Sequence, residues 1–147
     1  KRQEIELEVV EAGGIDSLRM IENEELDLAV TNYDDSFSPN LHYRKLFKSE
    51  ACFCTYPDHP LAQKKYVDTK DIANEPLVLL NGGFFVNRLI YQNFQQALTA
   101  PKVILHSSQL HTVKNLISSQ IASSFLMRQA ITASDNIIHF HLKSRFL

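Results

Sequence analysis

Two prolines within four residues, in the stretch YPDHPLAQ at residues 56–63, constrain the fold of this chain more than any other feature. Proline lacks a backbone N–H and fixes φ, so Pro57 and Pro60 exclude a helix interior or a central strand here. An apolar run, residues 51–55, precedes this break, and a charged run begins at Lys64. The break is either a hairpin loop or a crossing from one domain to another, and the local sequence leaves both open.

Before this break, strand-like and helix-like segments alternate. Residues 4–10 place glutamates on one face and aliphatic side chains on the other, which is typical of a half-buried strand. Residues 16–24 have helical spacing, and the apolar residues 26–30 predict a second strand, which completes a strand–helix–strand unit with parallel strands. Residues 32–40 are polar and predict a loop, and the next strand lies within residues 46–56.

The same alternation continues after the break. We expect a helical turn at residues 68–73, a strand at 76–80, a helix at 85–99 and a strand at 102–106. A helix follows that Ser107 and Ser108 can cap, and then a strand at 121–126, a short helix at 127–132 and a strand at 136–142. Strands and helices therefore alternate throughout the chain, which predicts an α/β architecture.

The composition argues against several classes of protein. The net charge of the 147 residues is -2 and the charges are interspersed, so no basic stripe suggests nucleic-acid binding by this segment. No apolar run approaches the roughly 18 residues of a membrane span, and no secretory signal is visible. Cys52 and Cys54 are too few for a disulfide framework and are expected to be core side chains in the reducing cytoplasm. Because the chain starts with Lys1 inside a strand-like pattern, we expect it to be a fragment.

Four motifs, in this order and spacing, resemble the effector-binding domain of LysR-type transcriptional regulators. They are EAGGI followed by Leu18 and ELDLAV in residues 11–30, HPLA at 59–62, Asp71-Ile72 with PLVLL at 76–80, and the helix of residues 109–117. The resemblance runs over nearly the whole chain. It implies the fold of type 2 periplasmic binding proteins, with two α/β lobes and a ligand in the cleft between them. It also makes YPDHPLAQ the exit from the first crossover between the lobes.

The resemblance implies a division of the chain into lobes. Lobe I is expected over residues 1–55, lobe II over residues 56–140, and the start of a return towards lobe I over residues 141–147. Members of the family begin this domain with a further strand and helix and end it with a returning strand and helix, so we expect both ends to be truncated here. The DNA-binding helix-turn-helix of the family is also absent from this sequence.

Candidate ligand-binding residues lie at the carboxyl ends of the predicted strands, where α/β sheets bind ligands. These turns are small or polar, and the last one opens a helix whose N-terminus favours an anion. Arg88 can supply a counter-charge, and one ring of Phe84-Phe85 can line the cleft while the other enters the core. Turn formation, capping and packing are the competing explanations. The candidate set, supported by the resemblance, is Gly13, Gly14, Thr31, Asn32, Gly82, Gly83, Phe84, Arg88, Ser107, Ser108, Gln109 and Thr112.

The function that the resemblance implies is small-molecule sensing without a covalent reaction. A carboxylate or aromatic metabolite in the cleft is expected to shift the arrangement of the lobes and so to change the oligomer. This oligomer is expected to be a homodimer, and a tetramer in the full-length protein. DNA contact is expected only through the absent helix-turn-helix domain. The protein is expected in the cytoplasm. The alternatives are a transport-type solute-binding protein, which needs an export signal or lipid anchor, and an enzyme on the same fold.

Neither catalysis nor a metal site is expected from the sequence. No catalytic motif appears, and no cofactor is expected. Three histidines on predicted strands, His106, His139 and His141, are of a type that binds zinc. Because no cysteine or carboxylate joins them at ligand spacing, we interpret them as surface or half-buried residues and expect no metal.

Overall fold

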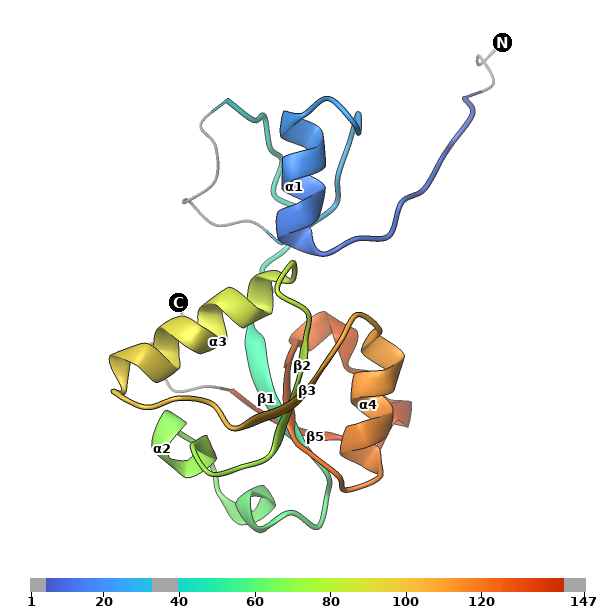
Figure 1. The fold of residues 1–147 in the computed structure, drawn as a ribbon. Helices are drawn as coiled ribbons and strands as arrows, with labels where there is room; N and C mark the ends of the chain where they lie inside the picture. Colours follow the sequence, from blue (N-terminus) through green and yellow to red (C-terminus); the bar gives the residue numbers. More distant parts are fainter. Residues whose placement is uncertain (1–4, 33–39, 142–147) are drawn as a thin grey trace.

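A computed structural model of the chain describes residues 5–32 and 40–141, and it contains two bodies joined by the segment 40–50 (Figure 1). The smaller, upper body is built around α1 (Gly14–Glu22), with Leu18 buried. The larger, lower body holds every element from β1 (Ala51–Thr55) onward. We call these the upper and lower bodies below.

The lower body is built on two small sheets. β1 is the central strand of an antiparallel sheet of order β4-β1-β5, in which β4 is Ser124–Met127 and β5 is Ile138–His141. β2 (Leu77–Leu80) and β3 (Val103–Ser107) form a parallel pair. A parallel bridge between Leu77 and Ser123 connects the two sheets just before β4.

Helices α3 (Phe85–Gln96) and α4 (Leu110–Ser118) lie on opposite sides of these strands (Figure 1). Each helix buries apolar residues four positions apart, Ile90 with Phe94 and Val113 with Ile117, as an amphipathic helix does. The shorter helices are η1 (Pro60–Gln63), α2 (Thr69–Ile72), η2 (Arg128–Ala130) and η3 (Ala133–Asp135). None of the helices in residues 5–32 and 40–141 has the length and apolar content that a membrane span requires.

The α/β architecture predicted from the sequence is confirmed. The β2-α3-β3 segment forms a parallel strand–helix–strand unit after the proline break. The predicted helix at 85–99 ends at Gln96, the predicted strand at 121–126 is Ser124–Met127, and the predicted helix at 127–132 is only the 3-10 turn Arg128–Ala130. These differences are confined to element boundaries and to one short turn.

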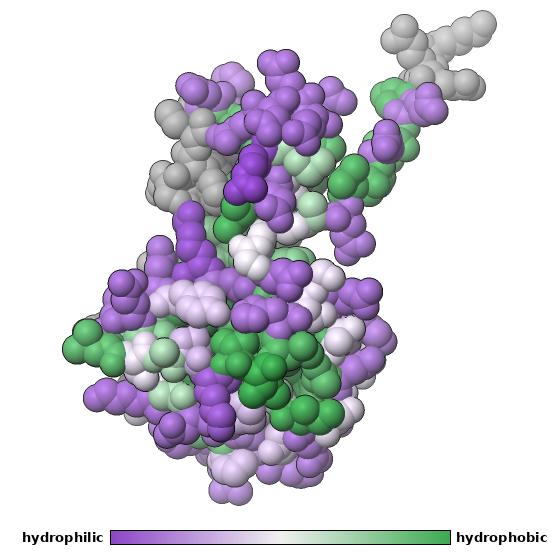
Figure 2. Space-filling view, in the orientation of Figure 1, coloured by the Kyte–Doolittle hydropathy of each residue, from purple (hydrophilic) through white to green (hydrophobic). Residues whose placement is uncertain are grey.

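The two strands predicted in the upper body do not form among the described residues. Segments 5–10 and 26–30 have no strand pairing there, and residue 4 and most of the predicted loop, residues 33–39, lie outside the described ranges. Their apolar side chains face solvent; Ile5 is 86% exposed and Leu28 is 80% exposed. Figure 2 shows the resulting alternation of apolar and polar residues along the segment that leaves the upper body. A strand needs a neighbour for its N–H and C=O groups, so alternation alone does not produce one.

The proline stretch ends β1 and leads directly into η1. His59 is buried and is the N-cap residue of η1: its Nδ1 accepts the backbone N–H of Leu61 at 3.1 Å. Its Nε2 therefore carries the proton and donates to the Glu75 carboxylate at 2.9 Å. The HPLA motif thus caps one turn and fastens it to the loop before β2.

Removing this histidine should destabilise the lower body. His59→Ala leaves a backbone N–H and a partly buried carboxylate without their partner, which we expect to lower the free energy of unfolding by about 1–3 kcal/mol. Urea unfolding measures this change. His111→Ala removes an exposed histidine of α4 and should change stability by no more than about 0.5 kcal/mol. Equal effects of the two substitutions would contradict the role assigned to His59.

Candidate functional site

The upper and lower bodies meet at two Gly-Gly turns. Gly82-Gly83 lies between β2 and α3, and Gly13-Gly14 begins α1. The backbone N–H of Ile15 donates to the carbonyl oxygen of Gly83 at 3.0 Å. A Cβ atom on Gly13 would collide with that same carbonyl group, so the close approach of the two backbones requires glycine. The structure thus brings three predicted ligand-binding residues, Gly13, Gly14 and Gly83, to one place.

Two helix N-termini face this junction. α1 starts at Gly14 and α3 starts at Phe85, and Figure 1 shows their first turns next to each other. Neither N-cap residue, Gly13 or Phe84, supplies a side-chain cap. The first N–H groups of a helix and the positive end of its dipole both favour an anion. The junction therefore has two elements that attract negative charge.

Thr31 adds a hydroxyl group to the junction. Its Oγ1 would lie 2.5 Å from a Cβ atom on Gly14, and the backbone nitrogen of Asn32 would lie 3.9 Å from it. Among the residues that the structure describes, this buried Oγ1 has no hydrogen-bond partner. Because an unsatisfied buried hydroxyl is costly, it is a candidate for binding a polar ligand atom.

Asp16 is a residue of the junction that the sequence analysis missed. Its carboxylate lies where a Cβ atom on Gly83 would be, and Oδ1 is 3.6 Å from the Arg19 guanidinium. An acidic side chain in the first turn of a helix interacts favourably with the dipole, and this pattern is visible in the sequence. The contact with Gly83 is not visible there, because it depends on how the two bodies pack.

The predicted residues at the end of β3 and the start of α4 lie at the same end of the sheet as the Gly82-Gly83 turn. The backbone N–H of Asn81 donates to the Ser107 carbonyl oxygen at 2.9 Å. The expectation that Ser107 or Ser108 caps α4 is wrong: Gln109 is the N-cap residue and the helix has no side-chain cap. The Ser107 hydroxyl accepts the N–H of Gln109 itself, at 3.1 Å. The Thr112 hydroxyl donates to the Gln109 side chain at 3.2 Å, which orders the first turn of α4.

Arg88 and the two phenylalanines are in or next to the first turn of α3. The Arg88 guanidinium carbon is 5.4 Å from the centre of the Phe85 ring, within the range of a cation–π contact. Phe85 is buried, and Phe84 is partly buried and packs against the hydrophobic core. Phe84 therefore contributes to core packing, and Phe85 is buried beside the Arg88 guanidinium.

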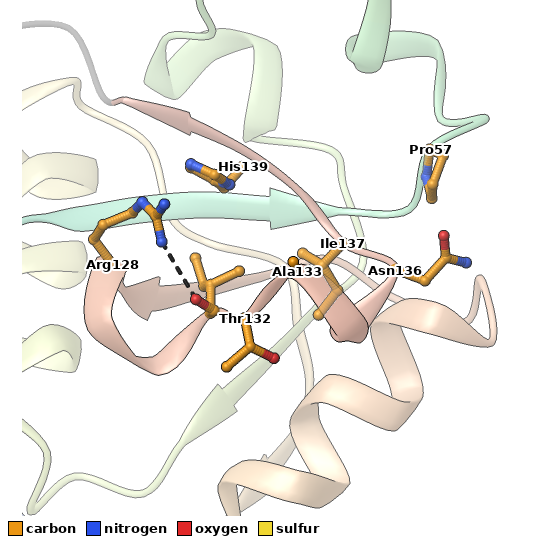
Figure 3. Close-up of a pocket in the computed structure, with 8 residues that line it drawn as sticks. Pro57, Arg128, Thr132, Ala133, Asn136, Ile137 and His139 are labelled. Atoms are coloured by element: carbon orange, nitrogen blue, oxygen red, sulfur yellow. Dashed lines mark hydrogen bonds between the residues drawn. The ribbon is translucent and has the colours of Figure 1, made fainter.

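A hollow of about 430 Å³ lies elsewhere, between β5 and the η2-η3 segment (Figure 3). Arg128 donates to the Ile131 carbonyl oxygen at 3.3 Å on one side of it. Burial lowers the pKa of His139 at its wall. The lining residues, none of which is in the candidate set, are Pro57, Arg128, Ile131, Thr132, Ala133, Asn136, Ile137 and His139.

An ion pair holds the η3 turn beside this hollow against α4. The Lys114 ammonium lies 2.8 Å from Asp135 Oδ2, and both side chains are mostly buried. The same carboxylate accepts the backbone N–H of Thr132 at 2.6 Å. The hydrogen bond from Lys114, followed by those from Thr132, lowers the pKa of Asp135 to about 2. Asp135 is therefore ionised in the folded protein at neutral pH.

The structure separates the histidines considered as zinc ligands. His106 Nε2 lies 3.4 Å from the Tyr91 hydroxyl, on the α3 side of β3. His139 and His141 lie together on β5, with ring centres 6.1 Å apart. Cys52 and Cys54 are both buried in β1 as expected of core side chains, and burial raises the pKa of Cys52 to about 11. Without an added ligand, both thiols are protonated, because burial raises the pKa of Cys54 as well.

The fold defines a class of protein: an α/β domain of the type 2 periplasmic-binding-protein kind. A family model described as the LysR substrate binding domain matches residues 1–143, and the chain belongs to this family. The resemblance seen in the sequence motifs is thereby confirmed.

Individual relatives agree with this assignment. The malolactic fermentation system transcriptional activator of Lactococcus lactis is 27% identical over 124 residues, which are 82% of this chain and 42% of that protein. The chain thus spans less than half of this relative. The regulatory domain of CcmR from Synechocystis PCC6803, in complex with 2-PG, has a TM-score of 0.76 and 17% identity, covering 89% of this chain and 64% of that one. The effector binding domain of QuiR in complex with shikimate has a TM-score of 0.73 and 20% identity, covering 90% and 63%.

The close contact at Gly13 leads to a test of the junction itself. In Gly13→Ala the added methyl group must push the Gly83 carbonyl away, so the Ile15 amide proton should exchange with solvent faster. Gly82→Ala is the matched control, because a Cβ atom there meets nothing within 4 Å. Amide hydrogen exchange measures both variants. The contact is refuted if the Ile15 amide exchanges equally in Gly13→Ala and the wild type.

The Lys114–Asp135 pair predicts a pH dependence of stability. We expect the pKa of Asp135, measured by NMR, to be about 2 and to rise in Lys114→Met, whereas Lys102→Met at an exposed site should leave it unchanged. Because the folded pKa lies below the ordinary value of about 3.9, the pair stabilises the protein at higher pH, and this contribution is lost as the pH falls through about 2. Acid unfolding of Lys114→Met should accordingly depend less on pH in that range. An unchanged pKa would assign the shift to Thr132 instead.

Proposed function

We propose that this chain is the effector-sensing domain of a LysR-type transcriptional regulator, and that a small carboxylate binds where the upper and lower bodies meet. The observation that carries the proposal is the meeting of the α1 and α3 N-termini at Gly13 and Gly83. Membership of the family supports the sensing role. The curated relative named above is a transcriptional activator, which favours this role over transport; regulators of this kind are generally not enzymes. The QuiR domain was solved with shikimate, itself a carboxylate.

The junction supplies the groups that a carboxylate needs. Backbone N–H groups at the two helix starts donate to its oxygens, apart from the Ile15 N–H, which already donates to Gly83. The Thr31 hydroxyl donates to a further polar atom of the ligand. Arg88, in the first turn of α3, adds positive charge on the lower body. Asp16 competes with the ligand, since its carboxylate lies against Gly83. Ligand binding therefore requires the Asp16 side chain to move away from Gly83. Arg19, whose guanidinium is already near Asp16, can pair with the carboxylate in its new position.

Such a ligand contacts both bodies and thereby acts on their arrangement. Its affinity depends on how the bodies sit, so binding shifts the population towards the arrangement that binds better. The expected division, with lobe I at residues 1–55, lobe II at 56–140 and the return at 141–147, needs one change: we place the boundary of lobe I before Ala51, because β1 lies in the sheet of the lower body. The pairing of β1 with both β4 and β5 supports treating residues 51–55 as the crossover itself.

A second copy of the chain is the proposed protein partner. Figure 2 shows an apolar patch on the lower body where β3 runs, and the exposed side chains of this strand include Ile104 and Leu105. An apolar strand at a sheet edge is a suitable surface for pairing. DNA binding, and the change from dimer to tetramer, belong to a longer protein with a helix-turn-helix domain.

Thermal unfolding of the protein with a panel of carboxylates, shikimate included, tests the proposal. A carboxylate at about 100 times its Kd should stabilise the folded state by about 2.7 kcal/mol, and its neutral methyl ester should not. Thr31→Val should weaken the effect, because it removes a hydroxyl and keeps the shape. Thr99→Val, beyond the far end of α3, is the matched control. Asp16→Asn should strengthen binding, because it removes the competing charge.

The possible outcomes distinguish an error in the position of the site from an error in the class of ligand. Stabilisation by esters as well as acids would contradict an anion site. Stabilisation by carboxylates that is unchanged in Thr31→Val and Asp16→Asn would place the ligand away from the junction. If no carboxylate of the panel binds, the proposed ligand class is wrong.

A further inference from the structure

Three possible metal ligands from two strands meet at the start of β1. Cys52 lies directly opposite His141 in the β1–β5 register, and Glu50 precedes Cys52 by two residues. Side chains two residues apart on an extended chain share a face, so all three point the same way. The Cys52 sulfur, a Glu50 oxygen and a His141 nitrogen all lie within 4.8 Å of one another. The closest pair, Glu50 Oε1 and His141 Nδ1, is 3.0 Å apart.

The burial of the three side chains makes an open-topped site. Cys52 is fully buried, whereas the side chains of Glu50 and His141 are 48% and 67% exposed. The thiol therefore forms the base, and the carboxylate and the imidazole form a rim that an ion can reach from solvent. Hard cations such as Mg²⁺ and Ca²⁺ take oxygen ligands, whereas a thiolate and an imidazole favour zinc and similar ions.

We propose that Glu50, Cys52 and His141 bind a divalent transition-metal ion of the zinc class, with a fourth position open to water or to another ligand. On binding, the Cys52 S–H bond is replaced by a sulfur–metal bond and the proton goes to solvent. The thiolate and the carboxylate then neutralise the two charges of the ion. Arg128, whose charge acts on Cys52, opposes the ion, and the two anionic ligands outweigh it.

The bound ion ties β1 to β5 at the point where the chain arrives from the upper body. The segment 40–50 leads from the upper body to β1, and Glu50 is its last residue. β5 runs antiparallel to β1, so its last described residue, His141, lies at the same end. A metal here restrains the point where the connecting segment 40–50 enters β1.

Cobalt titration of the protein, reduced with a phosphine that does not chelate metals, tests this site. Co²⁺ is the probe because a thiolate ligand produces a charge-transfer band that histidine and carboxylate do not. We expect one Co²⁺ per chain with this band, its displacement by Zn²⁺, and a higher Tm with Zn²⁺. Cys52→Ala should abolish the band. His141→Gln should weaken Co²⁺ binding by at least about 100-fold, the upper end of the effect of losing a supporting outer-shell group.

Two matched variants serve as controls. Cys54→Ala removes the other buried thiol of β1, and His139→Gln removes the neighbouring histidine of β5; both should keep the band and the affinity. His141→Gln decides the test if Cys52→Ala fails to fold, because His141 is on the surface. The proposal is overturned if saturating Co²⁺ gives no charge-transfer band, or if the band survives His141→Gln with unchanged affinity. Loss of the band in Cys54→Ala while Cys52→Ala keeps it would overturn it as well.

Discussion

The lower body depends on the pairing of β1 along both of its edges. All five residues of this strand are buried, and Phe53 lies between Phe125 of β4 and Phe140 of β5 in the register. The rings of Phe53 and Phe125 meet edge-on at 5.5 Å, an arrangement that aromatic pairs favour. Because β1 also receives the chain from the upper body, its position determines where the connecting segment 40–50 enters the lower body. Pro57 and Pro60, which follow β1, prevent the strand from extending beyond its partner strands.

The sequence predicted the lower body well because its signals are local. A proline before four aliphatic residues marked β2, and helical spacing marked α3 and α4. The upper body was predicted less well, because residues 5–10 and 26–30 become strands only if neighbours pair with them. A similar distinction applies to helix capping: two adjacent serines suggested a cap, whereas the turn geometry makes Gln109 the N-cap residue and directs the Ser107 hydroxyl to the Gln109 N–H.

The candidate site was predictable by residue type and not by contact. Small and polar turns at strand ends indicated Gly13, Gly14, Thr31 and Gly83, which the fold brings together. The contact of Asp16 with Gly83 joins segments almost seventy residues apart in sequence, and no local pattern encodes it. The cluster at Cys52 was missed for a related reason: ligand spacing along the chain was absent, whereas the register of β1 and β5 places Cys52 opposite His141.

The energetics of the junction suit a switch. The backbone hydrogen bond from Ile15 to Gly83 is worth only about 1 kcal/mol net. A ligand that binds one arrangement more tightly can exceed this term at modest concentration. A metal at the root of β1 acts on the same connection, because it restrains the strand that the segment 40–50 enters. If the two arrangements hold Glu50 and His141 at different distances, the metal and the effector must each change the affinity of the other by the same factor. In that case the proposed effector site and the proposed metal site are two inputs to one equilibrium between the bodies.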